Sequence, residues 1–76
     1  MTDKELKAQK EYHYASAALD VALLERRAAL EEIKDIHVEA TNEMVESFRL
    51  KHDAVKTAFQ RLTDAVTEVL SSQHSS

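Results

Sequence analysis

Apolar side chains recur at steps of three and four residues along most of this chain, and that spacing places them on one face of an α-helix. Side chains spaced in this way pack between neighbouring helices. We therefore expect an all-α protein that associates with itself through this face. The expected self-association face consists of Tyr12, Leu19, Leu23, Arg26, Leu30, Ile33, His37, Met44, Phe48, Val55, Phe59, Leu62, Val66 and Val69.

The repeat changes phase once, between Met44 and Phe48, where a step of four residues replaces a step of three. Just before this point, residues 36–42 are rich in β-branched and polar residues that form helices poorly. Two interpretations fit this pattern. The chain either turns between two helices or forms one long continuous helix in a coiled-coil oligomer that unwinds locally at the phase change.

The hairpin is the interpretation we favour, with the break near residues 40–43. One helix would then cover about 3–39 and the other about 43–70, which gives two helices of similar length. Either Thr41 or Asn42 can cap the second helix, because both side chains accept hydrogen bonds from free backbone N–H groups.

The two ends of the chain differ in character. Thr2 and Glu5 have the spacing of a capping box, so a helix is expected to begin at about residue 3. Residues 71–76 contain only Ser, Gln and His, and we expect them to form a disordered polar tail. The sequence therefore predicts a single helical domain over residues 1–70.

A second apolar stripe occupies the other side of the first helix. Its members are Tyr14, Ala17, Val21, Leu24 and Ala28. A helix with two apolar faces requires two neighbours, and a single hairpin supplies only one. We therefore expect two hairpins to associate into an antiparallel four-helix bundle, with a homodimer favoured.

Composition narrows the range of functions. The chain has 76 residues and no Cys, Gly or Pro, so it has no thiolate ligands and no glycine-rich phosphate loop. The net charge of −4 argues against direct binding to nucleic acid. Long apolar runs and an apolar leader are missing, so we expect a cytoplasmic protein without a membrane span.

Carboxylates gather around the middle of the chain, and they would share one helical face if the first helix continued through residue 40. Such like-charge neighbours disfavour a helix, which raises the hypothesis of a docking stripe for a basic protein surface. The alternative is that the basic residues of the second helix neutralise it. The stripe consists of Glu32, Asp35, Glu39, Glu43 and Glu46, and the basic residues are Arg49, Lys51, Lys56 and Arg61.

Catalytic and metal sites find no support in the pattern. The Glu-x-x-His spacing of di-iron bundles does not occur, and no Ser is paired with a His and a carboxylate. His37 and His52 fall on the apolar stripe, where we expect them to bond to a neighbour. Arg26 also falls there, as a register-setting ion pair or with its stem extended to the edge.

The sequence thus predicts a small acidic helical protein that is not an enzyme and needs no cofactor. It would act through helix–helix contacts as an adaptor, an inhibitor or an assembly factor. The alternative is a purely structural coiled-coil scaffold or filament element. Its expected partners are a second copy of itself and a basic protein surface.

Overall fold

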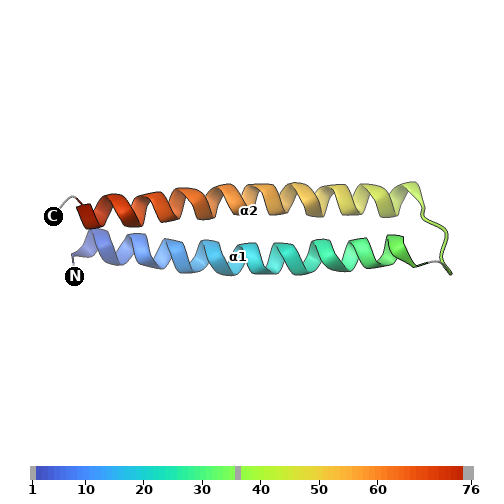
Figure 1. Ribbon diagram of the computed structural model, residues 1–76, viewed down its shortest axis with the longest axis horizontal. Coiled ribbons are helices and arrows are strands. Elements are labelled where there is room, and N and C mark those ends of the chain that lie inside the picture. The colour runs from blue at the N-terminus through green and yellow to red at the C-terminus, as the bar shows by residue number, and fades with distance from the viewer. Residues whose placement is uncertain (1, 36, 75–76) are drawn as a thin grey trace.

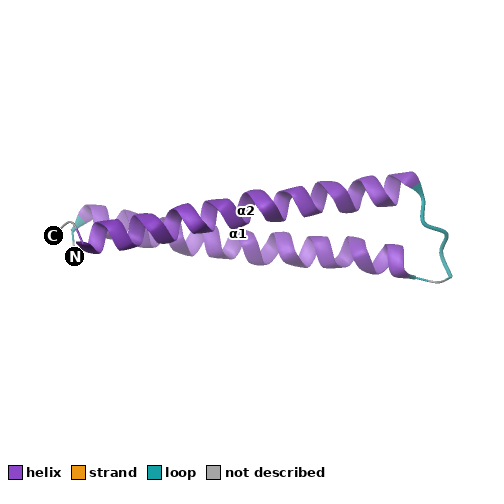
Figure 2. Cartoon of the chain, turned by 45° about the horizontal axis from the view of Figure 1, so that its top comes forward, coloured by secondary structure: helices purple, strands orange, loops and turns teal. Residues whose placement is uncertain are grey.

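The computed structural model describes residues 2–35 and 37–74 and shows two antiparallel α-helices joined by one loop (Figure 1). Helix α1 spans Asp3–Lys34 and helix α2 spans Asn42–His74, and the described ranges contain no strand. The helical hairpin is therefore confirmed, and the alternative of one continuous helix is wrong. The two helices lie side by side (Figure 1), and in the turned view α2 passes in front of α1 near the chain termini (Figure 2).

Both helices begin at a threonine that caps them. The Thr2 hydroxyl accepts a hydrogen bond from the backbone N–H of Glu5 at 3.2 Å, and the Thr41 hydroxyl accepts one from Met44 at 3.2 Å. Each bond satisfies one of the N–H groups that the first turn of a helix leaves free. The predicted cap at Thr2 is confirmed, and Thr41 rather than Asn42 caps α2.

Helix α1 ends at Lys34, earlier than the expected end near residue 39. The next residue, Asp35, has an extended backbone (φ −66°, ψ 113°), and its carboxylate accepts a hydrogen bond from the N–H of His37 at 2.9 Å. A short carboxylate that bonds to nearby backbone competes with the helix in this way. The apolar periodicity predicted a helix that was too long, because periodicity takes no account of this local hydrogen bond.

Helix α2 continues to His74 and so includes part of the expected polar tail. The Ser72 side chain is buried, and its hydroxyl donates a hydrogen bond to the carbonyl of Val69 at 2.9 Å. Burial of this small side chain against the start of α1 makes the last turn part of the hairpin. Ser75 and Ser76, the rest of the expected tail, lie outside the described residues.

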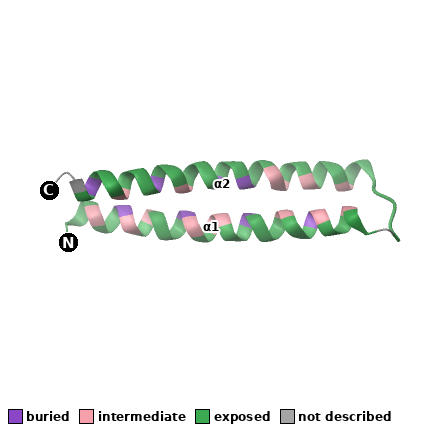
Figure 3. Ribbon diagram, in the orientation of Figure 1, coloured by how far each residue is buried: buried purple, intermediate pink, exposed green. Residues whose placement is uncertain are grey.

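Small side chains fill the seam between the helices. Ala15 has no exposed surface, and no large side chain in the described residues is fully buried. Colouring by burial places the buried positions on the inward side of both helices and leaves the outward sides exposed (Figure 3). The buried apolar residues are Ala8, Ala15, Ala22, Ala29, Val55, Ala58 and Ala65.

One of the two rows of residues in this seam differs from the expected one. The sequence pattern placed Leu23 and Leu30 beside the row of Leu19 and Ile33, whereas the structure buries the preceding Ala22 and Ala29 there. On α2 the buried residue is likewise Ala58, and Phe59 is 61% exposed. Alanines opposite larger residues such as Leu19 and Val55 let the helices interdigitate at close range, and large side chains such as Phe59 lie outside the seam.

The hairpin is long and thin. Its extents are 58 × 14 × 13 Å and its radius of gyration is 17.1 Å, against about 11 Å for a compact domain of this length. Its accessible surface is 5920 Å², whereas a compact monomer of 8.6 kDa exposes about 4,700 Å². The single hairpin thus exposes about 1,200 Å² more surface to water than a compact monomer of the same mass.

Candidate interaction surfaces

The structure divides the expected self-association face into two parts. One part is buried or half-buried between α1 and α2, so it holds the hairpin itself together. Leu19, for example, packs against Ala22, Val55 and Ala58. This inner part consists of Leu19, Arg26, Ile33, Met44, Phe48, Val55, Leu62 and Val69.

The other part runs along one side of the seam, where Val45 and Leu70 extend it, and we call this side the apolar edge. Four of its residues, Leu23, Leu30, Phe59 and Val66, follow a buried alanine by one position, and in an antiparallel pair such positions share a side. Tyr12, Val66 and Leu70 line one hollow together, which shows that both helices contribute to this side. The apolar edge consists of Tyr12, Leu23, Leu30, Val45, Phe59, Val66 and Leu70. His37, also expected on the face, lies exposed in the loop.

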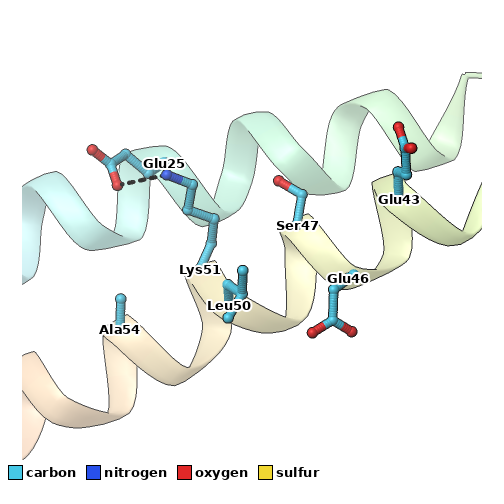
Figure 4. A pocket seen from close by; sticks show the side chains of 7 residues that line it. All are labelled: Glu25, Glu43, Glu46, Ser47, Leu50, Lys51 and Ala54. Carbon is cyan, nitrogen blue, oxygen red and sulfur yellow. Dashed lines mark hydrogen bonds and ion pairs between the residues drawn. The ribbon is translucent and has the colours of Figure 1, made fainter.

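The opposite side of the seam carries charge, and we call it the charged edge. Arg61 binds Glu11 through two hydrogen bonds, Nε to Oε1 at 2.7 Å and Nη2 to Oε2 at 3.3 Å. Lys51 donates to Glu25 at 3.3 Å farther along (Figure 4). The hydrogen bonds from Arg61, with its positive charge, lower the pKa of Glu11 despite some desolvation. These pairs fix the register of the helices.

Between the two ion pairs the charged edge is shallow and lined by small side chains. Ala18 and Val21 from α1 and Ala54 and Thr57 from α2 line a groove there. Sequence reasoning did not single out Glu11 as a partner of α2. The separation of Glu11 from Glu25 by two heptads, with Ala18 midway, was the available signal.

A hydrogen bond crosses the seam where Arg26 lies. Its Nη1 is 3.4 Å from Nδ1 of His52, and both side chains are partly buried. The His52 ring also stacks on Phe48, with ring centroids 6.0 Å apart and an interplanar angle of 16°. Arg26 therefore has its polar partner within the hairpin, and His52 bonds to a neighbouring helix as expected of a seam histidine.

The second apolar face lies on the outer side of α1 and borders the charged edge at Val21, which also lines the groove there. All five of its residues are exposed, with Tyr14 at 66% and Leu24 at 65%. Nothing in the described part of the hairpin covers them. The face consists of Tyr14, Ala17, Val21, Leu24 and Ala28.

The acidic stripe does not form one helical face, because α1 ends before the stripe does. Glu32 is on α1, Asp35 and Glu39 are outside the helices, and Glu43 and Glu46 are on α2. The carboxylates of Glu43 and Glu46 point away from each other (Figure 4). The premise of a continuous row of carboxylates on one helix is therefore wrong, although all five side chains are exposed near the loop.

The basic residues of α2 pair mostly with carboxylates outside the stripe. Arg61 and Lys51 contact Glu11 and Glu25, as described above, whereas Arg49 lies 3.9 Å from Glu46. Lys56 is exposed on α2. Neutralisation of the stripe by α2 is thus limited, in the ion pairs of the described residues, to this one long contact.

Across residues 2–35 and 37–74 no group of three or more His, Asp or Glu side chains could hold a metal ion. Neither helix is long and apolar enough over its described length to cross a membrane.

No family model matches the sequence, and no curated protein or solved structure matches it significantly. Function therefore has to be inferred from the surfaces of the hairpin itself.

Proposed function

We propose that this chain is a non-enzymatic binding protein that acts through helix–helix contacts, as an adaptor, an inhibitor or an assembly factor. A cytoplasmic location is part of this proposal. The observation that carries it is the exposure of large apolar side chains: the most buried positions of the seam are mostly alanines, and twelve large apolar side chains of the described residues are exposed. Burying a large apolar side chain contributes about 1.5–3 kcal/mol, so the outward faces hold most of the unused binding energy.

Two outward surfaces are available for partners. The apolar edge draws on both helices, whereas the second apolar face belongs to α1 alone. Both present side chains in the three- and four-residue steps that one helix offers to another. A partner helix can therefore occupy one surface while the other stays free, which is the arrangement an adaptor needs.

Chemistry for catalysis is not part of the proposal. The ionisable side chains of the charged edge pair with one another across the seam, and they line a shallow groove of alanines rather than an enclosed cavity. Enzyme active sites generally combine a concave pocket with convergent reactive groups. We therefore assign the charged edge to holding the hairpin in register.

Affinity capture from an extract of the producing cells, with quantitative mass spectrometry, tests the proposal. The bait is the intact chain, and the matched bait is Leu24→Ser, which changes the second apolar face but touches no seam residue. The proposal expects a heterologous protein in stoichiometric amount that reassembles with the chain from purified components. Its affinity should fall at least tenfold, about 1.4 kcal/mol, for the variant of whichever face it covers.

The other variant bait is Phe59→Ser, which changes the apolar edge. Phe59 is about as exposed as Leu24. Recovery of the chain alone with all three baits, together with self-association that grows into filaments as concentration rises, would support the structural alternative. That alternative is a coiled-coil scaffold whose only partner is itself.

A further inference from the structure

The geometry points to a second copy of this chain on the apolar edge. We propose that two hairpins pack edge to edge with their loops at opposite ends, so that Phe59 of each copy meets Phe59 of the other at the two-fold axis. This inference deepens the proposed function, since it rests on the outward apolar side chains being binding surfaces. It leaves the second apolar face open for a different protein.

The composition of the edge suits a self-complementary contact. Twelve large apolar side chains are exposed in the described residues, and six of them belong to this edge. All the ion pairs between the helices in residues 2–35 and 37–74 lie on the opposite, charged edge. A symmetric dimer presents the same patch twice, and an apolar patch is complementary to itself without any matching of charges.

The excess accessible surface of the hairpin is enough for an interface with one second copy. The excess surface over a compact monomer is about 1,200 Å², and a stable interface of standard size removes about 800 Å² from each partner. An alanine seam buries little apolar surface per residue, and scaffolds of this size often require association for stability. One second copy is enough to bring the accessible surface of each chain close to that of a compact protein.

Charge selects the orientation of the two hairpins. Residues 31–46, at the loop end, carry six carboxylates and one lysine, a net charge of −5 with His37 neutral. At the other end, residues 2–10 carry a net charge of +1 and residues 67–74 carry −1 with His74 neutral, so this end is neutral. Loops placed together would bring two strongly acidic ends within about one Debye length, near 8–10 Å, whereas opposed loops bring each acidic end to a neutral one.

Phe59 has the position that this symmetry requires. It lies next to the midpoint of α2, which spans Asn42–His74, and it is 61% exposed. With opposed loops, α2 of one copy runs antiparallel to α2 of the other, and only residues near the midpoint meet their own counterparts. Aromatic pairs at such a site add about 0.5–1.5 kcal/mol beyond their buried area.

Sedimentation velocity between 1 and 100 µM tests the contact. The wild-type chain is expected to be dimeric at the upper end, Phe59→Ser should raise the dissociation constant at least tenfold, and Leu24→Ser should leave it unchanged. Leu24 is a fair control because it is 65% exposed and lies on the other face. Circular dichroism of each variant establishes that the helices are intact.

Oxidative cross-linking tests the orientation, and the absence of Cys from the chain makes single-cysteine variants clean. Phe59→Cys should form a disulfide-linked dimer readily. A mixture of Leu30→Cys chains and Val45→Cys chains should not cross-link to each other, because those positions approach between copies only when the loops lie together.

A wild-type chain that stays monomeric at 100 µM overturns the inference, as does equal weakening by Phe59→Ser and Leu24→Ser. Cross-linking of the mixed pair in place of Phe59→Cys overturns the orientation. A monomeric chain that still binds a heterologous protein in the capture experiment would leave the proposed function standing while removing the second copy. A chain that neither dimerises nor captures a heterologous protein would contradict both proposals.

Discussion

Arg26 on α1 and His52 on α2 are joined by a hydrogen bond of 3.4 Å that crosses the half-buried seam. Arg26 has no acceptor atom, so its Nη1 donates and Nδ1 of His52 accepts in this bond. This pair stands where a coiled coil normally has an apolar residue, and a single polar seam residue of that kind specifies register. The contact thus defines one alignment of the two helices.

A double-mutant cycle of Arg26→Met and His52→Leu should measure a favourable coupling of less than about 1 kcal/mol, because net hydrogen bonds contribute about 0.5–1.5 kcal/mol and this one is long. Urea unfolding at a fixed protein concentration provides the values. Arg27→Met is the control, since Arg27 is exposed beside Arg26. Equal coupling of His52 to Arg26 and to Arg27 would show that the contact is not formed.

Enlarging the seam should destabilise the hairpin. Ala15 has no exposed surface, so Ala15→Leu should overpack the seam and lower the free energy of unfolding by about 1–3 kcal/mol. Ala17→Leu, on the exposed side of the same helix, should change it by less than about 0.5 kcal/mol. Thermal and urea unfolding followed by circular dichroism measure both. Tolerance of leucine at position 15 would mean that the helices do not meet at their alanines.

The Glu11–Arg61 pair predicts a pH dependence of definite sign. The folded state lowers the pKa of Glu11 below its ordinary value of 4.5. Its contribution to stability is therefore fully present above about pH 4.5 and is lost as the pH falls through the lowered pKa. Glu11→Gln should reduce the melting temperature slightly at pH 7 and have no effect once wild-type Glu11 is protonated. A reduction that persists at the acid limit would contradict this assignment.

The helix caps give a prediction about the start of each helix. Thr2→Ala and Thr41→Ala should each destabilise the chain by about 0.5–2 kcal/mol, because each leaves a first-turn N–H without its acceptor. Thr57→Ala, in the interior of α2, should be neutral or slightly stabilising, since alanine has the higher helix propensity. Hydrogen exchange should show faster exchange in the first turn of the affected helix alone.

Much of the hairpin could be predicted from local chemistry. Thr2 predicted the start of the first helix because its spacing to Glu5 is that of a capping box, and Thr41 was one of the two caps expected for the second helix. Leu19 and Ile33 were correctly placed on the seam because they occupy a core position of the seven-residue repeat, and the structure half-buries both. Asp35 ended α1 earlier than expected, since its competition with the helix depends on the backbone beyond it and not on periodicity.

Hydrophobicity alone could not predict which neighbours of Leu19 and Ile33 would be buried with them. Leu23 and Leu30 bury more apolar area than Ala22 and Ala29, so a pattern of hydrophobic strength favours the wrong neighbours. The regular seven-residue spacing of alanines, from Ala8 onward, was the signal that close helix approach would favour them. Helix packing depends on how surfaces interlock as well as on how apolar they are.

The dependence of thermal stability on protein concentration tests most directly whether the outward apolar side chains are binding surfaces. Association stabilises the folded state by mass action, so the melting temperature of the wild-type chain should rise between 1 and 100 µM. Leu24→Ser should retain this rise and Phe59→Ser should lose most of it. A cooperative unfolding transition at the same temperature across the whole range, with an intact hairpin at 1 µM, would contradict the account.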